Sequence, residues 1–178
     1  MKLFDVNTSK LPVSSFIAIS IIVIYLLFTT NIISEIPCGT SIHNIFMSNF
    51  VHIDAAHLIS NLYALYAISR VEEKMGFKPF IWLIVFLLAF NTLVEYMLRN
   101  VIKDMKCSIG FSGILFGLIT WELLTTRKLD VQLIIAIVIS VITPSIGNKK
   151  VSLSGHAVGA LSGVVGGIIW KTINTEKI

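Results

Sequence analysis

A serine between two glycines heads an apolar run in "CSIGFSGILFGLITW", and this residue is Ser112. A serine hydroxyl is a weak nucleophile that needs an adjacent base. Histidine can accept that proton near neutral pH, and His156 begins a second apolar run in "SLSGHAVG". Gly110 and Gly113 would let the backbone bend and let a substrate approach the hydroxyl closely. The pattern is consistent with acyl transfer by a Ser112–His156 pair.

A third apolar run begins with "AAHLISN", which contains His57 and Asn61. Residues four apart share a helix face, and their side chains are hydrogen-bond donors suited to a developing oxyanion. The three runs alternate with other apolar runs, so as membrane spans they would start from the same side. Ser112, His156, His57 and Asn61 would then reach one depth and line one cavity.

A structural explanation exists for each of these residues taken alone. A serine flanked by glycines in a membrane helix is often part of a packing face, and a histidine at the end of a span is often interfacial. Asp54 fits an N-cap of the helix that carries His57. Glycines also recur every four residues along the last apolar run, which favours close packing on a neighbouring helix. They are Gly155, Gly159, Gly163 and Gly167.

The composition indicates a membrane protein. The chain has 178 residues, of which 55% are hydrophobic and 13% are charged, against about 25% charged in soluble domains. A net charge of +4 without a basic stripe argues against a nucleic-acid partner. No metal or other cofactor is implied, because the histidines lack the helical His-Glu-x-x-His spacing.

Six apolar segments predict an all-α fold, a bundle of six transmembrane helices in one domain over residues 1–178. The predicted spans are 13–33, 55–69, 79–98, 110–126, 129–146 and 152–170. They should be helical because backbone groups in lipid must be satisfied within the segment. Residues 37–50 fit no span, and either an interfacial helix or an irregular loop would suit them.

An even number of spans places both termini on one side of the membrane. Lys and Arg are more numerous on that side, which predicts cytoplasmic termini and a cavity that opens to the opposite side. Cys38 and Cys107 both fall on the opposite side, where an oxidising compartment would allow a disulfide. We favour two free thiols, because the sequence does not show Cα atoms within about 7 Å.

Taken together, these residues resemble the rhomboid family of intramembrane serine proteases in its six-span form. "GFSG" resembles the family motif of the nucleophile, and "HAVG" resembles the motif of the base, which includes Gly159. The resemblance therefore assigns Ser112 as nucleophile and His156 as base. Phe116 matches an aromatic position that stacks on the catalytic histidine, where many relatives have tyrosine.

Two further motifs extend the resemblance. "HIDAAHLISN" is similar to the second-span pattern of the family, which implies oxyanion roles for His57 and Asn61 and a structural role for His52. "EEKMG" is similar to a Glu-x-x-x-Gly motif and implies that Glu72 and Gly76 form a polar anchor at a helix end. The first loop departs from the family, because His43-Asn44 stands where relatives often have Trp-Arg.

The resemblance implies a serine endopeptidase that cleaves transmembrane segments of membrane proteins within the lipid bilayer. Two alternatives stay open. One is a catalytically inactive relative that binds and sorts membrane proteins, although Ser112 and His156 are both present. The other is a small transporter, which would be expected to show inverted repeats or broken helices in corresponding halves.

Overall fold

A computed structural model describes residues 11–102, 105–126, 131, 135, 138 and 152–175. These residues form helices and, within the described ranges, no strand. The helices are α1 (Pro12–Thr29), α2 (Ile42–Ser48), α3 (Ala55–Ile68), α4 (Arg70–Met75), α5 (Phe77–Val101), α6 (Ser112–Thr126) and α8 (Leu153–Thr175). The predicted all-α class is confirmed for this part of the chain.

The helices differ in whether they are long enough to span a bilayer. Among the described residues, three are long and apolar enough to cross a membrane: α1, α5 and residues Leu153–Asn174 of α8. The predicted spans 55–69 and 110–126 become α3 and α6, with 14 and 15 residues, and roughly 20 helical residues are needed for a complete crossing. The predicted fifth span, 129–146, lies outside the described residues except for Val131, Ile135 and Val138, which are helical.

Segment 37–50 contains the short helix α2, so the interfacial-helix expectation was right about its helical part. The hydroxyl oxygen of Ser41 accepts a hydrogen bond from the Asn44 N–H at 3.2 Å and caps the first turn of α2. His43 and Asn44, which replace the family's Trp-Arg, both lie on this helix, and neither lines the cavity described below.

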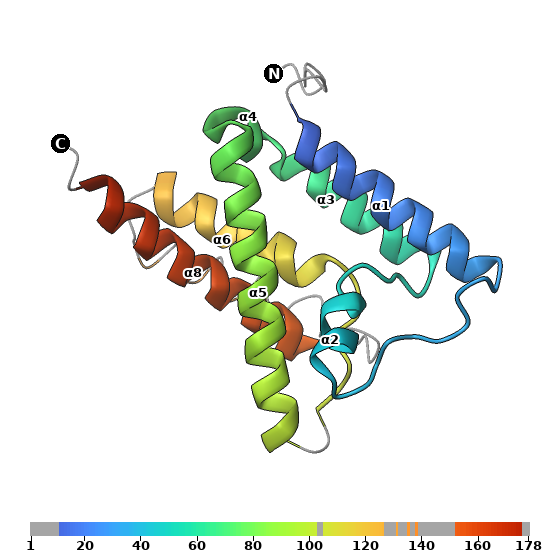
Figure 1. Ribbon diagram of the computed structural model, residues 1–178. Helices are drawn as coiled ribbons and strands as arrows, with labels where there is room; N and C mark the ends of the chain where they lie inside the picture. The colour runs from blue at the N-terminus through green and yellow to red at the C-terminus, as the bar shows by residue number, and fades with distance from the viewer. Residues whose placement is uncertain are drawn as a thin grey trace.

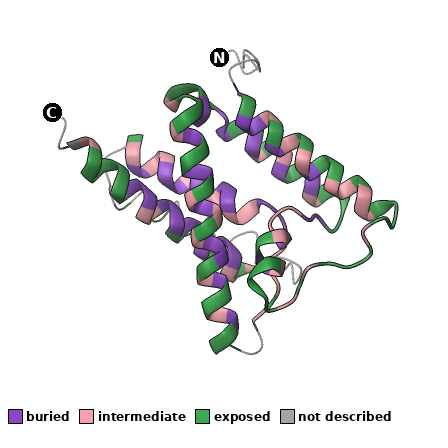
Figure 2. Ribbon diagram, in the orientation of Figure 1, coloured by how far each residue is buried: buried purple, intermediate pink, exposed green. Residues whose placement is uncertain are grey.

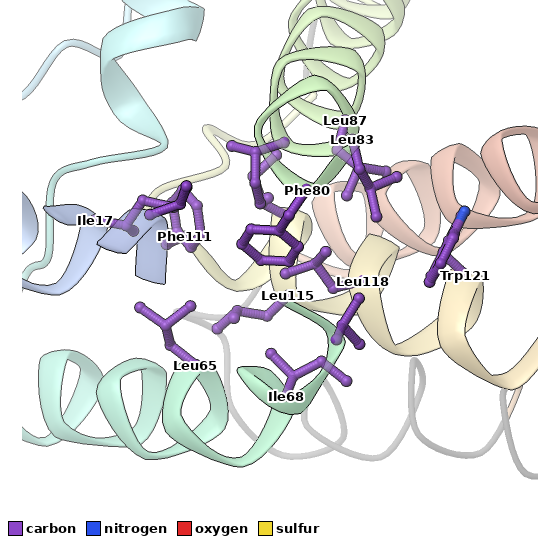
Figure 3. Close-up of a cluster of buried hydrophobic side chains, with 14 of the residues drawn as sticks. Ile17, Leu65, Ile68, Phe80, Leu83, Leu87, Phe111, Leu115, Leu118 and Trp121 are labelled. Atoms are coloured by element: carbon purple, nitrogen blue, oxygen red, sulfur yellow. The ribbon is translucent and has the colours of Figure 1, made fainter. Parts of the chain in front are cut away.

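α6 lies at the centre of the fold. In Figure 1, α5 crosses α6 and α8, while α1 and α3 run side by side. Buried side chains of α3, α5 and α6 converge in one apolar cluster (Figure 3), together with Ile17 of α1 and Phe111. Figure 2 shows that α1 and α5 also have exposed faces. The exposed residues of these two helices include the apolar side chains of Phe16, Trp82 and Leu93. Such faces suit contact with lipid.

Glu72 of α4 anchors the start of α1, as the Glu-x-x-x-Gly resemblance implied. Its carboxylate accepts hydrogen bonds from the Val13 N–H at 2.8 Å, from the Ser14 N–H at 2.8 Å and from the Ser14 hydroxyl at 2.6 Å. The first N–H groups of a helix have no partner within it, and Leu11, the N-cap residue, makes no side-chain cap. A fully buried carboxylate from another helix satisfies them instead.

We expect Glu72→Gln to lower the free energy of unfolding by about 2 kcal/mol. The two carboxylate oxygens of Glu72 accept three hydrogen bonds, whereas the amide of glutamine has only one oxygen and replaces the other by an NH2 group, which cannot accept. Thermal unfolding in detergent measures the loss. Glu73→Gln is the matched control, since Glu73 is the neighbouring residue of α4 but is exposed. Equal stability of the two variants would contradict an anchoring role for Glu72.

Candidate active site

A cavity of about 570 Å³ lies where α3, α5, α6, α8 and the segment 105–111 meet. Its lining includes all four polar residues that the sequence placed at one depth. They are Ser112, His156, His57 and Asn61. Polar groups from helices far apart in the chain therefore converge on one space, which is the arrangement expected of a ligand or substrate site.

Ser112 and His156 lie within hydrogen-bond distance of each other. Ser112 is the first residue of α6, and His156 lies in the first turn of α8. The Nε2 atom of His156 is 3.0 Å from the Ser112 hydroxyl oxygen. The ring of Phe116 packs on the imidazole with centroids 4.5 Å apart, as the family resemblance implied. The geometry is that of a nucleophile beside a base.

Glycines explain how two helices bring these side chains together. α6 and α8 lie side by side and run in the same direction (Figure 1). A Cβ atom on Gly159 would collide with the backbone carbonyl of Gly113, and one on Gly163 would collide with that of Gly117. The two backbones are therefore in direct contact along what we call the glycine seam, formed by Gly113, Gly117, Gly159 and Gly163. The seam begins at Gly113, the residue after Ser112. It therefore fixes how closely the first turns of α6 and α8, which carry Ser112 and His156, lie to each other.

His57 and Asn61 form the opposite wall of the cavity. The Asn61 Nδ2 atom donates to the His57 carbonyl at 2.9 Å, which leaves one amide hydrogen for another acceptor. The Asp54 carboxylate accepts from the His57 N–H at 2.8 Å and so caps α3, as the sequence indicated. The first of these bonds orients the Asn61 amide, and His57 and Asn61, four residues apart on one face of α3, both line the cavity.

His52 lies behind this wall rather than in the cavity. It is fully buried, and its ring centroid is 4.9 Å from that of His57. Burial lowers the pKa of His52 to about 4, with His57 as the second cause. The ring is therefore neutral at physiological pH, and it supports the His57 ring from outside the cavity.

Gly110 places the segment 105–111 against both α2 and α3. Its φ of +100° lies in the left-handed region that favours glycine. A Cβ atom at this position would stand 2.5 Å from the Cε1 atom of His57. Its N–H donates to the Ser48 carbonyl at 2.9 Å. The backbone just before Ser112 is thus held between α2 and the His57 ring.

Cys38 and Cys107 form a disulfide, with their Cα atoms 5.5 Å apart. Our preference for two free thiols was therefore wrong. The bridge joins positions 69 residues apart in sequence, so no local pattern reports it. It fixes the start of the segment that leads to Ser112, while the Phe50 and Phe111 rings, 6.0 Å apart, fix its end.

Replacement of both cysteines by serine should lower the free energy of unfolding by about 3 kcal/mol, because the bridge restricts the unfolded chain. Activity should fall only in part, since the Gly110–Ser48 hydrogen bond and the Phe50–Phe111 contact remain. Thermal unfolding with and without reductant measures the change. Reductant should destabilise the native sequence and leave the double variant unchanged. A native protein whose two thiols are fully alkylated without reductant would exclude the bridge.

The sequence reasoning missed a row of buried polar residues on α5. Asn91, Glu95 and Arg99 are spaced four apart, and Asn91 and Glu95 line the cavity. An Arg99 nitrogen donates to the Glu95 Oε2 atom at 3.0 Å. Polar residues at helical spacing within an apolar span mark functional positions by default, so this signal was present in the sequence.

The described residues contain no group of three or more His, Cys, Asp or Glu side chains that could hold a metal ion. The polar groups in the cavity are instead hydroxyl, imidazole, amide and carboxyl groups. Such a set supports acid–base and nucleophilic chemistry by side chains.

Comparison with known proteins identifies the family of the chain. The family model described as the rhomboid domain matches residues 39–172. The chain is also similar to a protein of Acanthamoeba polyphaga mimivirus that is provisionally named rhomboid protein L523. The two are 29% identical over 128 residues, which cover 71% of this chain and 74% of the viral protein. The family match covers most of the chain and includes Ser112, His156, His57 and Asn61, and the chain belongs to the rhomboid family.

Proposed function

We propose that this protein is an intramembrane serine endopeptidase that cleaves transmembrane segments of membrane proteins. One observation carries the proposal: the 3.0 Å distance between the His156 Nε2 atom and the Ser112 hydroxyl in a cavity large enough for a peptide segment. Membership of the rhomboid family supports the same activity.

In the proposed mechanism, His156 accepts the Ser112 proton as the hydroxyl oxygen attacks a peptide carbonyl. The carbonyl oxygen becomes an oxyanion. The Ser112 N–H, which is the first of α6 and has no partner within the helix, donates to it, together with His57 and Asn61. The imidazolium then protonates the leaving amine. Water, deprotonated by His156, releases the acyl group and restores Ser112.

The alternative function is that of an inactive rhomboid-like protein that binds and sorts membrane proteins. It shares the fold, so only the chemistry of the cavity separates the two. Hydrogen-bonding distance between the serine and the histidine favours the enzyme, because a binding protein has no need of a base beside a hydroxyl.

A serine-directed fluorophosphonate tests the enzyme proposal. We expect it to label the detergent-solubilised protein at Ser112, because the probe reacts with an activated serine and not with an ordinary hydroxyl. Mass spectrometry of the labelled peptide identifies the residue, and Ser162, a buried serine of α8 that lies outside the cavity lining, is an internal control. Labelling elsewhere or none at all would favour the binding protein.

We further propose a single domain that comprises six spans with cytoplasmic termini, so that the cavity opens on the opposite side. The charge distribution supports this topology. A cysteine introduced at Lys2, in a background with serine at both native positions, should resist an impermeant thiol reagent in intact cells, and one introduced at Ser41 should react. Labelling at Lys2 would contradict the topology.

A further inference from the structure

Two polar residues of α5, Asn91 and Glu95, line the cavity without a role in the proposed chemistry. Asn91 and Glu95 are 3% and 5% exposed, one helical turn apart. The Asn91 Nδ2 atom donates to the Leu87 carbonyl at 2.8 Å and to the Ser162 hydroxyl at 3.1 Å. Its Oδ1 atom accepts no hydrogen bond from the part of the chain that the structure describes. The amide is therefore held in one orientation, with its acceptor available.

Glu95 presents a second acceptor in the same way. Its Oε2 atom is paired with Arg99, whose side chain is 4% exposed. Its Oε1 atom accepts from no described residue. The hydrogen bonds to Leu87 and Ser162 fix the orientation of the Asn91 amide, and the ion pair with Arg99 fixes that of the Glu95 carboxylate.

Both available oxygens lie beside the candidate catalytic residues. The Asn91 Oδ1 atom would be 3.4 Å from a Cβ atom on Gly113, the residue after Ser112. The Glu95 Oε1 atom would be 3.3 Å from a Cβ atom on Gly155, the residue before His156. The two oxygens therefore lie against the starts of α6 and α8, next to the Ser112–His156 pair, and both residues belong to the lining of the same cavity.

The chemistry of this wall restricts what it binds well. Both available atoms are acceptors, so an apolar group placed there would leave two buried acceptors unsatisfied. A cation would be buried near Arg99, which already neutralises Glu95, and an uncompensated second charge is costly. A neutral side chain that donates hydrogen bonds meets neither penalty.

We propose that Asn91 and Glu95 form a specificity subsite for a substrate residue with a neutral donor side chain, namely Ser, Thr, Asn or Gln. This proposal rests on the proposed function, since the subsite selects among segments bound at Ser112. Arg99 is a positioning residue, which acts by holding the Glu95 carboxylate in place.

The test uses a transmembrane reporter in which each residue that flanks the scissile bond is, in turn, Leu, Gln or Lys. At one position the native protein should cleave the Gln reporter about tenfold more efficiently than the Leu reporter, as expected for a hydrogen bond to a charged group. Lys at that position should be no better than Leu. Absence of a Gln preference at every position, or a preference for Lys, would overturn the proposal.

A double variant, Glu95→Met with Arg99→Leu, removes the ion pair and keeps the volume, a replacement that buried ion pairs often tolerate. The ratio of Gln to Leu cleavage should fall towards unity. The control is Lys74→Met with Glu122→Leu, which removes an ion pair of 3.1 Å that does not line the cavity. This control should keep the native ratio. A native ratio in the Glu95 variant would also overturn the subsite.

Binding of the same reporters to the Ser112→Ala protein, measured by fluorescence anisotropy in micelles, separates the two proposals. If no reporter is cleaved but the Gln form binds more tightly, the protease proposal fails and the subsite stands. If reporters are cleaved with no difference between Gln and Leu in either assay, the subsite fails and the protease proposal stands.

Discussion

Ser112→Ala should abolish cleavage of a transmembrane reporter, and His156→Ala should reduce it by about 10²–10⁴-fold, the usual contribution of a general base. The first change removes the hydroxyl that lies 3.0 Å from the His156 Nε2 atom. The second leaves a hydroxyl without a base. Because the pair acts as a unit, the double variant should be no worse than Ser112→Ala alone.

Initial rates of the purified variants measure these effects, with folding checked by thermal unfolding. Ser60→Ala is a matched control, because Ser60 also lines the cavity but donates its hydroxyl to the His57 carbonyl at 2.8 Å. Cleavage by Ser112→Ala at the native rate would show that Ser112 is a packing serine. A fully active His156→Ala protein with an inactive Ser112→Ala protein would move the base elsewhere, and His57 would be the next candidate.

Gly110→Ala should lower kcat by about 100-fold, the loss expected when a reacting group moves by about 1 Å. The new methyl group would stand 2.6 Å from the His57 Nε2 atom, so either the ring or the backbone before Ser112 must move. Both carry donors for the proposed oxyanion. The positive φ adds strain for any residue with a side chain.

Gly76→Ala is the control that separates collision from strain. Gly76 has a φ of +80°, but nothing lies within 4 Å of the position of its Cβ atom. The Gly76→Ala protein should lose stability through backbone strain, as the Gly110→Ala protein does, but it should keep its activity. If both variants lose activity equally, backbone strain is the cause and the His57 contact is irrelevant to catalysis.

The sequence predicted those features that depend on residue type and local spacing. Helical periodicity and the alternation of spans brought His57, Asn61, Ser112 and His156 to one place without any knowledge of contacts. The glycine repeat in α8 predicted close packing, and the structure supplies the partner, Gly113 and Gly117 of α6.

Other features depend on contacts between distant residues and had no local signal. The Cys38–Cys107 pairing required that α2 lie against the segment before α6, which no periodicity encodes. Asn91 and Glu95 do have a local signal, their four-residue spacing within an apolar segment, but only the packing of α5 against α6 and α8 places them in the cavity lining.

The glycine seam between α6 and α8 also restricts the route by which a membrane-embedded substrate reaches Ser112. Two backbones in contact leave no gap through which a polypeptide segment or a lipid chain can pass. Lateral access from the bilayer is therefore closed on the α8 side of the nucleophile for as long as the seam holds. In the proposed mechanism, a substrate segment would therefore approach from another side of the cavity and would meet the Ser112–His156 pair from a direction set by the contact between α6 and α8.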